Sequence, residues 1–273
     1  MPFQSADAYR RFAESVKHDR RFIYENDVNA FLDAVFETSA SRTATLAANA
    51  ILWRAQLGCN FDTRDKGTEQ ETEVEIPYFE DRMKPQPLMV KDGRANPRGI
   101  AYLYLATTAT TAGSELRPWL GAYLSMSQFR TKRELRLVDC TRDEKRWSFR
   151  FDKDLNLVPW SPEEYESVVW GDIGEAMSTP YNPDDSGLHY IPTQIISERL
   201  CHESVDGIVY RSLLGQDGFN IVLFDINDAD PINFTLYEAE VVTYKIEQRD
   251  NTYFAKKKKD VVPDDEPGAQ PAG

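Results

Sequence analysis

The chain has 273 residues, 41% of them hydrophobic, and a formal net charge of −13 at pH 7. This length can bury one large core, whereas the acidic balance argues against a nucleic-acid partner, which usually meets a basic face. Three cysteines without CxxC spacing predict neither a disulfide framework nor a zinc site. Because there is also no secretory leader and no long apolar run, we expect a cytoplasmic protein with no membrane partner.

The N-terminal part of the sequence predicts a helical annex over residues 1–48. Apolar residues at helical spacing indicate helices over 5–18 and 26–38, with Ser5 and Asn26 or Asp27 as N-caps. Next, AILWRAQLG (50–58) predicts a buried strand that carries a single arginine. The charge-dense segment 61–77 predicts a mobile polar loop at the surface.

The remaining elements alternate short strands with helices. The turn DGRANPRG (92–99) leads into the aromatic strand IAYLYLAT, and TTATTAGSELRPW predicts a short helix ended by Pro118. Ser161 and Pro162 open a helix over 161–178. Further strands are predicted over 123–129, 134–140, 208–210, 221–224 and 234–248, and a further helix over 191–204.

This mixture predicts an α+β fold with a mixed sheet, and not a doubly wound parallel sheet. The expected organisation is the annex (1–48), a main domain (49–250) and a disordered charged tail (251–273). Oligomeric state is left open.

Several common catalytic motifs are absent from the sequence. There is no GxGxxG, GxxxxGK[ST], HExxH or GxSxG. The three histidines have no partner at metal-ligand spacing, so we expect no metal.

What remains is a set of polar residues within strand-like apolar stretches: Arg54, Arg94, Tyr104, Glu115 and Ser212. Such residues are tolerated when they are paired. From local physics alone a structural Arg54–Glu115 ion pair is about as plausible as a functional site.

Several blocks of sequence resemble one known family. LWRAQLG, GRANPRGIAYLYLATTATTAGSELRPWLGAYLSMSQF, YIPTQIISERL and VDGIVYRSLLGQDGFNIVLFD are similar, in this order, to the RES domain. The resemblance implies an ADP-ribosyltransferase-like fold and breakage of the nicotinamide–ribose bond of NAD+, with water or inorganic phosphate as co-substrate. It also implies a toxin paired with a helix-turn-helix antitoxin protein.

The resemblance also assigns roles to individual residues. The family's arginine, glutamate and serine fall on Arg54, Glu115 and Ser212, which are the expected catalytic residues. Arg94 and Tyr104 are expected to bind substrate, and the resemblance carries Tyr102 over less firmly.

Each side chain type suits the implied reaction. Cleavage builds positive charge on the ribose, which Glu115 would stabilise more in the transition state than in the substrate. Arg54 and Arg94 would hold diphosphate or phosphate through their planar guanidinium groups. Tyr104 would stack on nicotinamide, and Ser212 would bind the ligand or orient Glu115, because no base is visible that would make it a nucleophile.

Two other function classes stay open. One is an ADP-ribosyltransferase acting on an unknown acceptor, and the other is a non-catalytic interaction module in which Arg54 and Glu115 only pair. The chain also adds the annex, the acidic segment 61–80 and a long segment near 141–189 to the compact toxin form. These additions place the toxin role and the antitoxin in question, but leave the named site residues in place.

Overall fold

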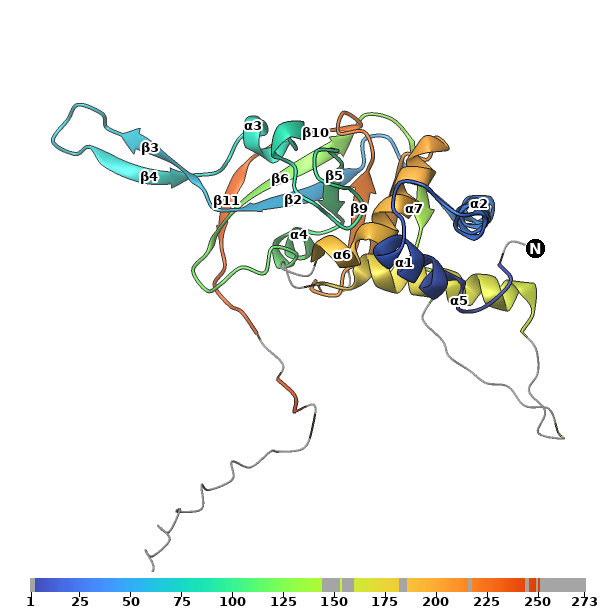
Figure 1. The fold of residues 1–273 in the computed structure, drawn as a ribbon. Coiled ribbons are helices and arrows are strands. Elements are labelled where there is room, and N and C mark those ends of the chain that lie inside the picture. Colours follow the sequence, from blue (N-terminus) through green and yellow to red (C-terminus); the bar gives the residue numbers. More distant parts are fainter. Residues whose placement is uncertain are drawn as a thin grey trace, which may run out of the picture. The chain divides into compact units, whose positions relative to one another are not determined.

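The computed structural model describes residues 3–143, 153, 160–181, 186–215, 218–243, 246–248 and 250. Contacts divide the chain into a large compact unit, Met1–Val242, and a short one, Thr243–Gly273. The large unit joins helices to a mixed sheet and begins with a helical segment, which confirms the predicted α+β class (Figure 1). The predicted tail (251–273) lies outside the described residues.

Several helices pack against one side of the sheet and contribute many residues to the core. Their bounds are α1 Ala8–His18, α2 Asn26–Ser39, α3 Glu80–Met83, α4 Ala109–Ser114, α5 Pro162–Ser178, α6 Ser186–His189 and α7 Ile191–His202, with 3₁₀ turns η1 Ala40–Arg42 and η2 Pro87–Met89. Helices α5 and α7 pack on strand β8, and α1 and α2 pack on α7. Side chains from all of these elements form one hydrophobic cluster that includes Phe12, Val35, Ile196 and Ile208.

The strands form one large sheet and one hairpin within the described residues. Their bounds are β1 Thr43–Leu46, β2 Ile51–Leu57, β3 Asn60–Arg64, β4 Thr72–Ile76, β5 Leu103–Ala106, β6 Tyr123–Thr131, β7 Leu135–Asp139, β8 Gly207–Arg211, β9 Phe219–Leu223, β10 Ala229–Pro231 and β11 Thr235–Glu238. The sheet order is β1-β7-β8-β9-β5-β2-β6-β10, and β11 also pairs with β6. Only the β7–β8 pairing is parallel among those described.

Residues in and next to strand β5 pack into two different hydrophobic clusters, one on each face of the sheet. Leu103 and Leu105 belong to a second hydrophobic cluster, whereas Tyr102 belongs to the helix-side cluster and Tyr104 packs against it. This alternation follows from the period of two along a strand. The aromatic residues of the predicted strand therefore face the side of the sheet that the helices cover.

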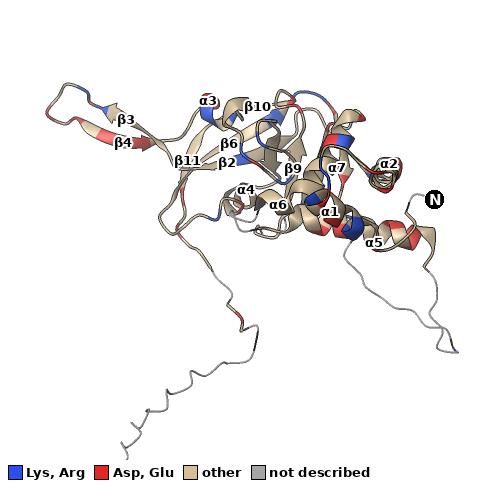
Figure 2. Ribbon diagram, viewed as in Figure 1, with Lys and Arg blue, Asp and Glu red and all other residues tan. Residues whose placement is uncertain are grey.

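The prediction of a mobile loop over 61–77 is wrong. Strands β3 and β4 pair antiparallel from Asn60↔Ile76 to Arg64↔Thr72 and form a hairpin that extends from the sheet (Figure 1). Acidic residues lie along β4 (Figure 2). The alternation of Thr72, Val74 and Ile76 is a strand pattern, but the charge density of the segment obscured it.

The last predicted strand, 234–248, is also shorter than expected. Strand β11 ends at Glu238, which pairs with Tyr123, the first residue of β6. The strand therefore ends where its partner begins. Of the predicted N-caps, Ser161 forms a full capping box with Glu164, but neither α1 nor α2 has a side-chain cap.

Candidate active site

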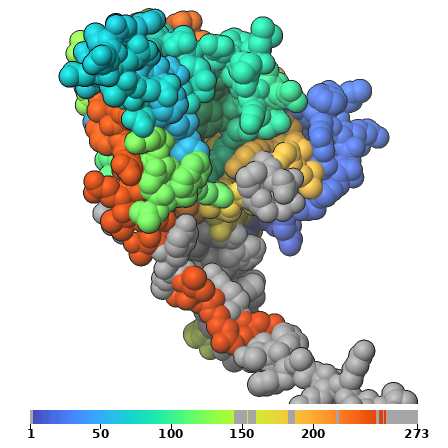
Figure 3. All heavy atoms as spheres, turned by 90° about the vertical axis from the view of Figure 1, so that its left-hand side faces the viewer, coloured from blue at the N-terminus to red at the C-terminus, as the bar shows by residue number. Residues whose placement is uncertain are grey.

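A cavity of about 710 Å³ opens on the face shown in Figure 3, which is hollowed between neighbouring segments. Four basic residues and two acidic residues line it, although the whole chain has a net charge of −13. The cavity therefore suits an anionic ligand. Its lining consists of Trp53, Arg54, Ala55, Gln56, Lys91, Asp92, Gly93, Arg94, Tyr104, Leu105, Ala106, Ala112, Glu115, Leu116, Arg117, Tyr181, Tyr190, Tyr210 and Asn220.

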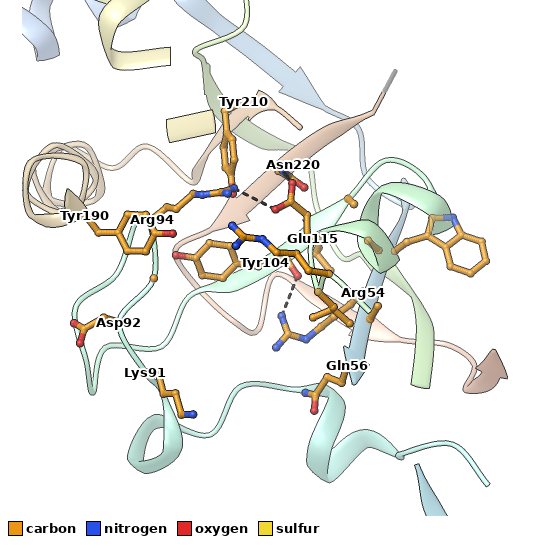
Figure 4. A pocket seen from close by; sticks show the side chains of 18 of the residues that line it. Arg54, Gln56, Lys91, Asp92, Arg94, Tyr104, Glu115, Tyr190, Tyr210 and Asn220 are labelled. Carbon is orange, nitrogen blue, oxygen red and sulfur yellow. Dashed lines mark hydrogen bonds and ion pairs between the residues drawn. The ribbon is translucent and has the colours of Figure 1, made fainter. Parts of the chain in front are cut away.

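The cavity lies where the central sheet splits. Strand β2 pairs with β6 over all seven residues, but with β5 only through Trp53↔Ala106. Beside this pair, the guanidinium of Arg54 donates a 2.9 Å hydrogen bond to the carbonyl of Tyr104 (Figure 4). The Arg54 side chain thus bonds to a β5 carbonyl where a longer ladder between β2 and β5 would place a backbone amide.

Arg54 is a partly buried cation without a carboxylate partner among the described residues. Its Nε has no hydrogen-bond partner, and burial lowers the pKa of Arg54 to about 10. A buried charge is costly unless a counter-charge compensates it. The arrangement therefore leaves Arg54 able to bind an anion that enters the cavity.

The GRANPRG turn is fixed by its own side chains. Asn96 donates from its amide to the backbone carbonyl of Pro97 within the turn and to those of Lys91 and Ile100 on either side of it. The Tyr104 hydroxyl donates to Asn96 Oδ1 at 2.7 Å and accepts from the Ala95 backbone amide at 2.9 Å. A Cβ atom at Gly93 would overlap Asn96 Oδ1 and the Tyr104 hydroxyl, so glycine permits this close approach.

The first turn of α7 holds the same loop from the other side. Thr193 donates to the carbonyl of Arg94, and Gln194 donates to the carbonyls of Gly93 and Asn96 at 2.9 and 3.0 Å. Both side chains are buried. Two sequence blocks about 100 residues apart are therefore needed to set the position of Arg94.

Glu115 follows α4 and faces three donors from distant parts of the chain. Its Oε2 pairs with Arg94 at 3.3 Å, and its Oε1 accepts from Ser212 at 2.8 Å and from Asn220 at 2.7 Å. Figure 4 shows Arg94, Asn220 and Glu115 pointing toward one another. The short helix ends at Ser114, directly before the carboxylate, after a Thr108 N-cap.

The Ser212 hydroxyl is fully engaged. It donates to Glu115, and its oxygen accepts from the backbone amides of Leu214 and Gly215 at 3.3 and 2.9 Å. With its proton shared with a carboxylate and its lone pairs occupied, the hydroxyl holds the Glu115 carboxylate in place.

Arg94 is buried, at 8% exposure, and is held by both a carboxylate and an aromatic residue. Its guanidinium lies 5.8 Å from the centre of the Tyr210 ring. Burial opposes the charge of Arg94, but Tyr210 and Glu115 outweigh it and keep the pKa of Arg94 above its ordinary value. Burial raises the pKa of Tyr210 to about 12, so its phenol stays protonated at neutral pH.

The structure brings together most of the predicted site residues. Arg94, Glu115 and Ser212 are in direct contact, and Arg54 and Tyr104 are joined through the Tyr104 carbonyl. The alternative of an Arg54–Glu115 ion pair is wrong, because the arginine that pairs with Glu115 is Arg94.

Tyr102 lies outside this cavity. Its ring packs against Phe224, with ring centroids 4.9 Å apart, and it lines an adjoining cavity of about 590 Å³ that shares Arg54, Lys91 and Tyr104 with the first. Burial holds the pKa of Tyr102 well above its ordinary value.

Sequence reasoning missed four residues of the site: Asn220, Tyr210, Tyr190 and Gln194. Asn220 is 5% exposed within the apolar strand FNIVL. An amide at such a position requires a buried partner, and this was the available signal. Gln194 had no comparable signal, because a polar residue near a helix start is usually solvated.

Two further properties concern the described part of the chain. None of its helices is both long and apolar enough to cross a membrane. Within the same residues, no group of three or more His, Cys, Asp or Glu side chains is placed to hold a metal ion.

The fold and site together define an α+β domain with a basic cleft around a fixed carboxylate. Comparison with known proteins places it more closely, because the sequence matches the RES domain family over residues 74–245. The chain belongs to the RES domain family. This result agrees with the resemblance that the sequence blocks suggested.

Two other comparisons add little. A chain in the crystal structure of the M. tuberculosis MbcT–MbcA toxin–antitoxin complex is 14% identical, with a TM-score of 0.38. The match covers 75% of this chain and 92% of that chain. No curated protein matches the sequence.

Proposed function

We propose that the protein cleaves the nicotinamide–ribose bond of NAD+ in the cavity around Glu115. Membership of the RES domain family supports an enzyme that acts on NAD+. The observation that carries the specific reaction is the carboxylate of Glu115, fixed by Arg94, Ser212 and Asn220 and facing a cavity in which basic residues outnumber acidic ones.

Glu115 is the proposed stabiliser of the transition state. Departure of nicotinamide develops positive charge on the ribose ring, and a preorganised carboxylate stabilises that charge with little reorganisation. Ser212 and Asn220 both donate to Oε1 of Glu115. These two hydrogen bonds hold the Oε1 atom in place. In this proposal Ser212 and Asn220 are positioning residues.

The two arginines are proposed to bind phosphate groups at different places. Arg94 already has a carboxylate partner and lies close to the proposed ribose position, whereas Arg54 has no carboxylate partner among the described residues. Arg54 is therefore the better candidate to bind diphosphate or a co-substrate phosphate. Tyr104, whose hydroxyl is occupied by the turn, would contribute its ring face to nicotinamide.

The test is loss of NAD+ in the presence of purified protein, with and without inorganic phosphate, with the products separated by chromatography. ADP-ribose formed without phosphate would identify a glycohydrolase. A phosphate-dependent reaction that yields ADP-ribose 1″-phosphate would identify a phosphorylase. No loss of NAD+ by folded protein would contradict the proposal and favour a transferase that lacks its acceptor, or a binding module.

We also propose that the activity makes the protein a toxin that is controlled by an antitoxin, as the family resemblance implies. Induced expression should then lower cellular NAD+ and arrest growth, and Glu115→Gln should abolish both effects. Growth arrest that persists in the Glu115→Gln variant would contradict this part of the proposal.

A further inference from the structure

Two tyrosines and one arginine form a wall of the cavity that the proposed reaction does not use. Tyr181, Tyr190 and Arg117 all line the cavity that contains Glu115. The Tyr181 and Tyr190 rings meet edge to face, with centroids 5.7 Å apart and planes at 71°. Such a corner offers the face of one ring and the edge of another to a flat ligand.

The Tyr181 ring is supported from behind. It stacks on His189, with centroids 4.3 Å apart and planes only 6° from parallel. Tyr181 lines both the main cavity and a smaller one of about 370 Å³ between α1 and α5, whereas His189 lines only the smaller cavity. Tyr181 therefore reaches the main cavity while its ring is stacked on His189, which helps to fix the orientation of the ring before any ligand binds.

Arg117 joins this wall through a strained backbone. Its φ of 49° lies in the left-handed region, and it directly precedes Pro118, a position that disfavours such conformations. The guanidinium donates to the carbonyl of Tyr181 at 3.4 Å. Arg117 also lies two residues after Glu115, so the same short segment carries the carboxylate and a donor on this wall.

We propose that Tyr181, Tyr190 and Arg117 form the subsite for the adenine base of the substrate, an inference that rests on the proposed action on NAD+. Flat bases bind by stacking on aromatic rings and guanidinium planes. Adenine is neutral and carries ring nitrogens that accept hydrogen bonds, which suits Arg117. The nicotinamide ring of NAD+ is a cation, which the charge of Arg117 would repel.

The experiment compares two substrates that share the scissile bond. NAD+ contains adenine, whereas nicotinamide mononucleotide has the same nicotinamide–ribose bond without it. Tyr181→Leu should lower kcat/KM for NAD+ by about tenfold to a hundredfold, mainly through KM, and leave kcat/KM for the mononucleotide unchanged. Tyr181→Phe, which retains the ring, should behave as wild type, as should Tyr237→Leu, a partly exposed tyrosine on β11.

A parallel loss for both substrates in Tyr181→Leu, or no loss for NAD+, would overturn the inference. Binding of AMP, measured by calorimetry, gives a readout that does not depend on turnover. If wild type binds AMP and Tyr181→Leu binds it about tenfold more weakly or worse, the subsite stands even if NAD+ is not cleaved. Equal AMP binding by the two proteins would overturn the subsite, whereas absence of NAD+ cleavage would overturn only the proposed function.

Discussion

The two arginines on either side of the split in the sheet differ in their partners. On the β5 side, Arg94 is paired with Glu115, lies near Tyr210, and has its backbone held by α7. On the β2 side, Arg54 has one backbone carbonyl as its partner and, among the described residues, no carboxylate. In the first arrangement a carboxylate already balances the charge of the arginine, and in the second, among the described residues, none does, so the two arginines should contribute differently to stability and to binding.

The largest expected effect comes from Glu115→Gln, which removes the negative charge that pairs with Arg94 on the β5 side. We expect kcat to fall by about a thousandfold, because the proposed role of the carboxylate is to stabilise charge that develops in the transition state. Unfolding should become easier by about 1.5–3 kcal/mol, because the single oxygen of glutamine can still accept from Ser212 and Asn220 but the buried Arg94 loses its anion. Turnover and thermal melting check this prediction.

Glu37→Gln, at an exposed position on α2, is the matched control and should change neither quantity. A folded and fully active Glu115→Gln protein would refute the catalytic role. A loss of about 3–5 kcal/mol in stability with no NAD+ chemistry in wild type would instead indicate a purely structural ion pair.

Arg54→Gln should separate binding from stability. The KM for NAD+ should rise by about tenfold to a hundredfold, because a charged hydrogen bond to phosphate is lost. Stability at neutral pH should not fall and should rise slightly. The pKa of Arg54 is lowered by burial to about 10, so the folded state releases this proton before the unfolded state does, and the burial penalty is fully present below pH 10.

Two measurements check the Arg54 prediction. Inorganic pyrophosphate should raise the melting temperature of wild type but not of Arg54→Gln, since a ligand that binds only the folded state stabilises it. Arg94→Gln, by contrast, should lower stability, because it leaves Glu115 without its cation. If both arginine variants melt alike, the contrast between the two sides is wrong.

Ser212→Ala should have an intermediate effect on the reaction. We expect kcat to fall by about tenfold to a hundredfold with KM unchanged, because Glu115 loses one of its two Oε1 donors. Asn220→Ala should behave similarly in steady-state kinetics. Activity reduced to background by Ser212→Ala, with Asn220→Ala nearly normal, would point to a serine nucleophile and contradict the positioning role.

The smallest effects concern the turn that carries Arg94. Gly93→Ala should cost about 1–3 kcal/mol by overpacking against Asn96 and Tyr104. Gly99→Ala provides the comparison, because its φ is +90° and nothing lies within 4 Å of an added Cβ, so it should cost only about 1 kcal/mol through backbone strain. Chemical denaturation checks both variants, and equal costs would contradict the packing argument.

Most of the fold could be predicted because its elements carry local signals. The capping box at Ser161, the alternation of β5 and the helical spacing of α2 lie within single segments of sequence. The β3–β4 hairpin was missed because charged residues occupy its exposed positions, and the end of β11 is set by where β6 begins. The alternation of β4 was present in its own segment but obscured by charge, whereas the end of β11 cannot be read from its own segment.

The site was partly predictable for a similar reason. Sequence blocks identified Arg54, Arg94, Glu115 and Ser212, but could not show which arginine faces the carboxylate. That choice depends on α7, which holds the 93–96 turn, and on the split between β2 and β5. Asn220 reaches Glu115 only because β9 lies next to β5.

The single ladder pair Trp53↔Ala106 also has a mechanical meaning. It makes the sheet two half-sheets joined at one rung, with Arg54 on one half and Arg94, Glu115, Ser212 and Asn220 on or beside the other. Rows of ladder hydrogen bonds resist sliding and opening, and here that resistance is at its lowest across the cleft. A ligand bound by both Arg54 and the opposite half would link the two half-sheets. It would supply contacts between β2 and β5 where the backbone supplies only one ladder pair.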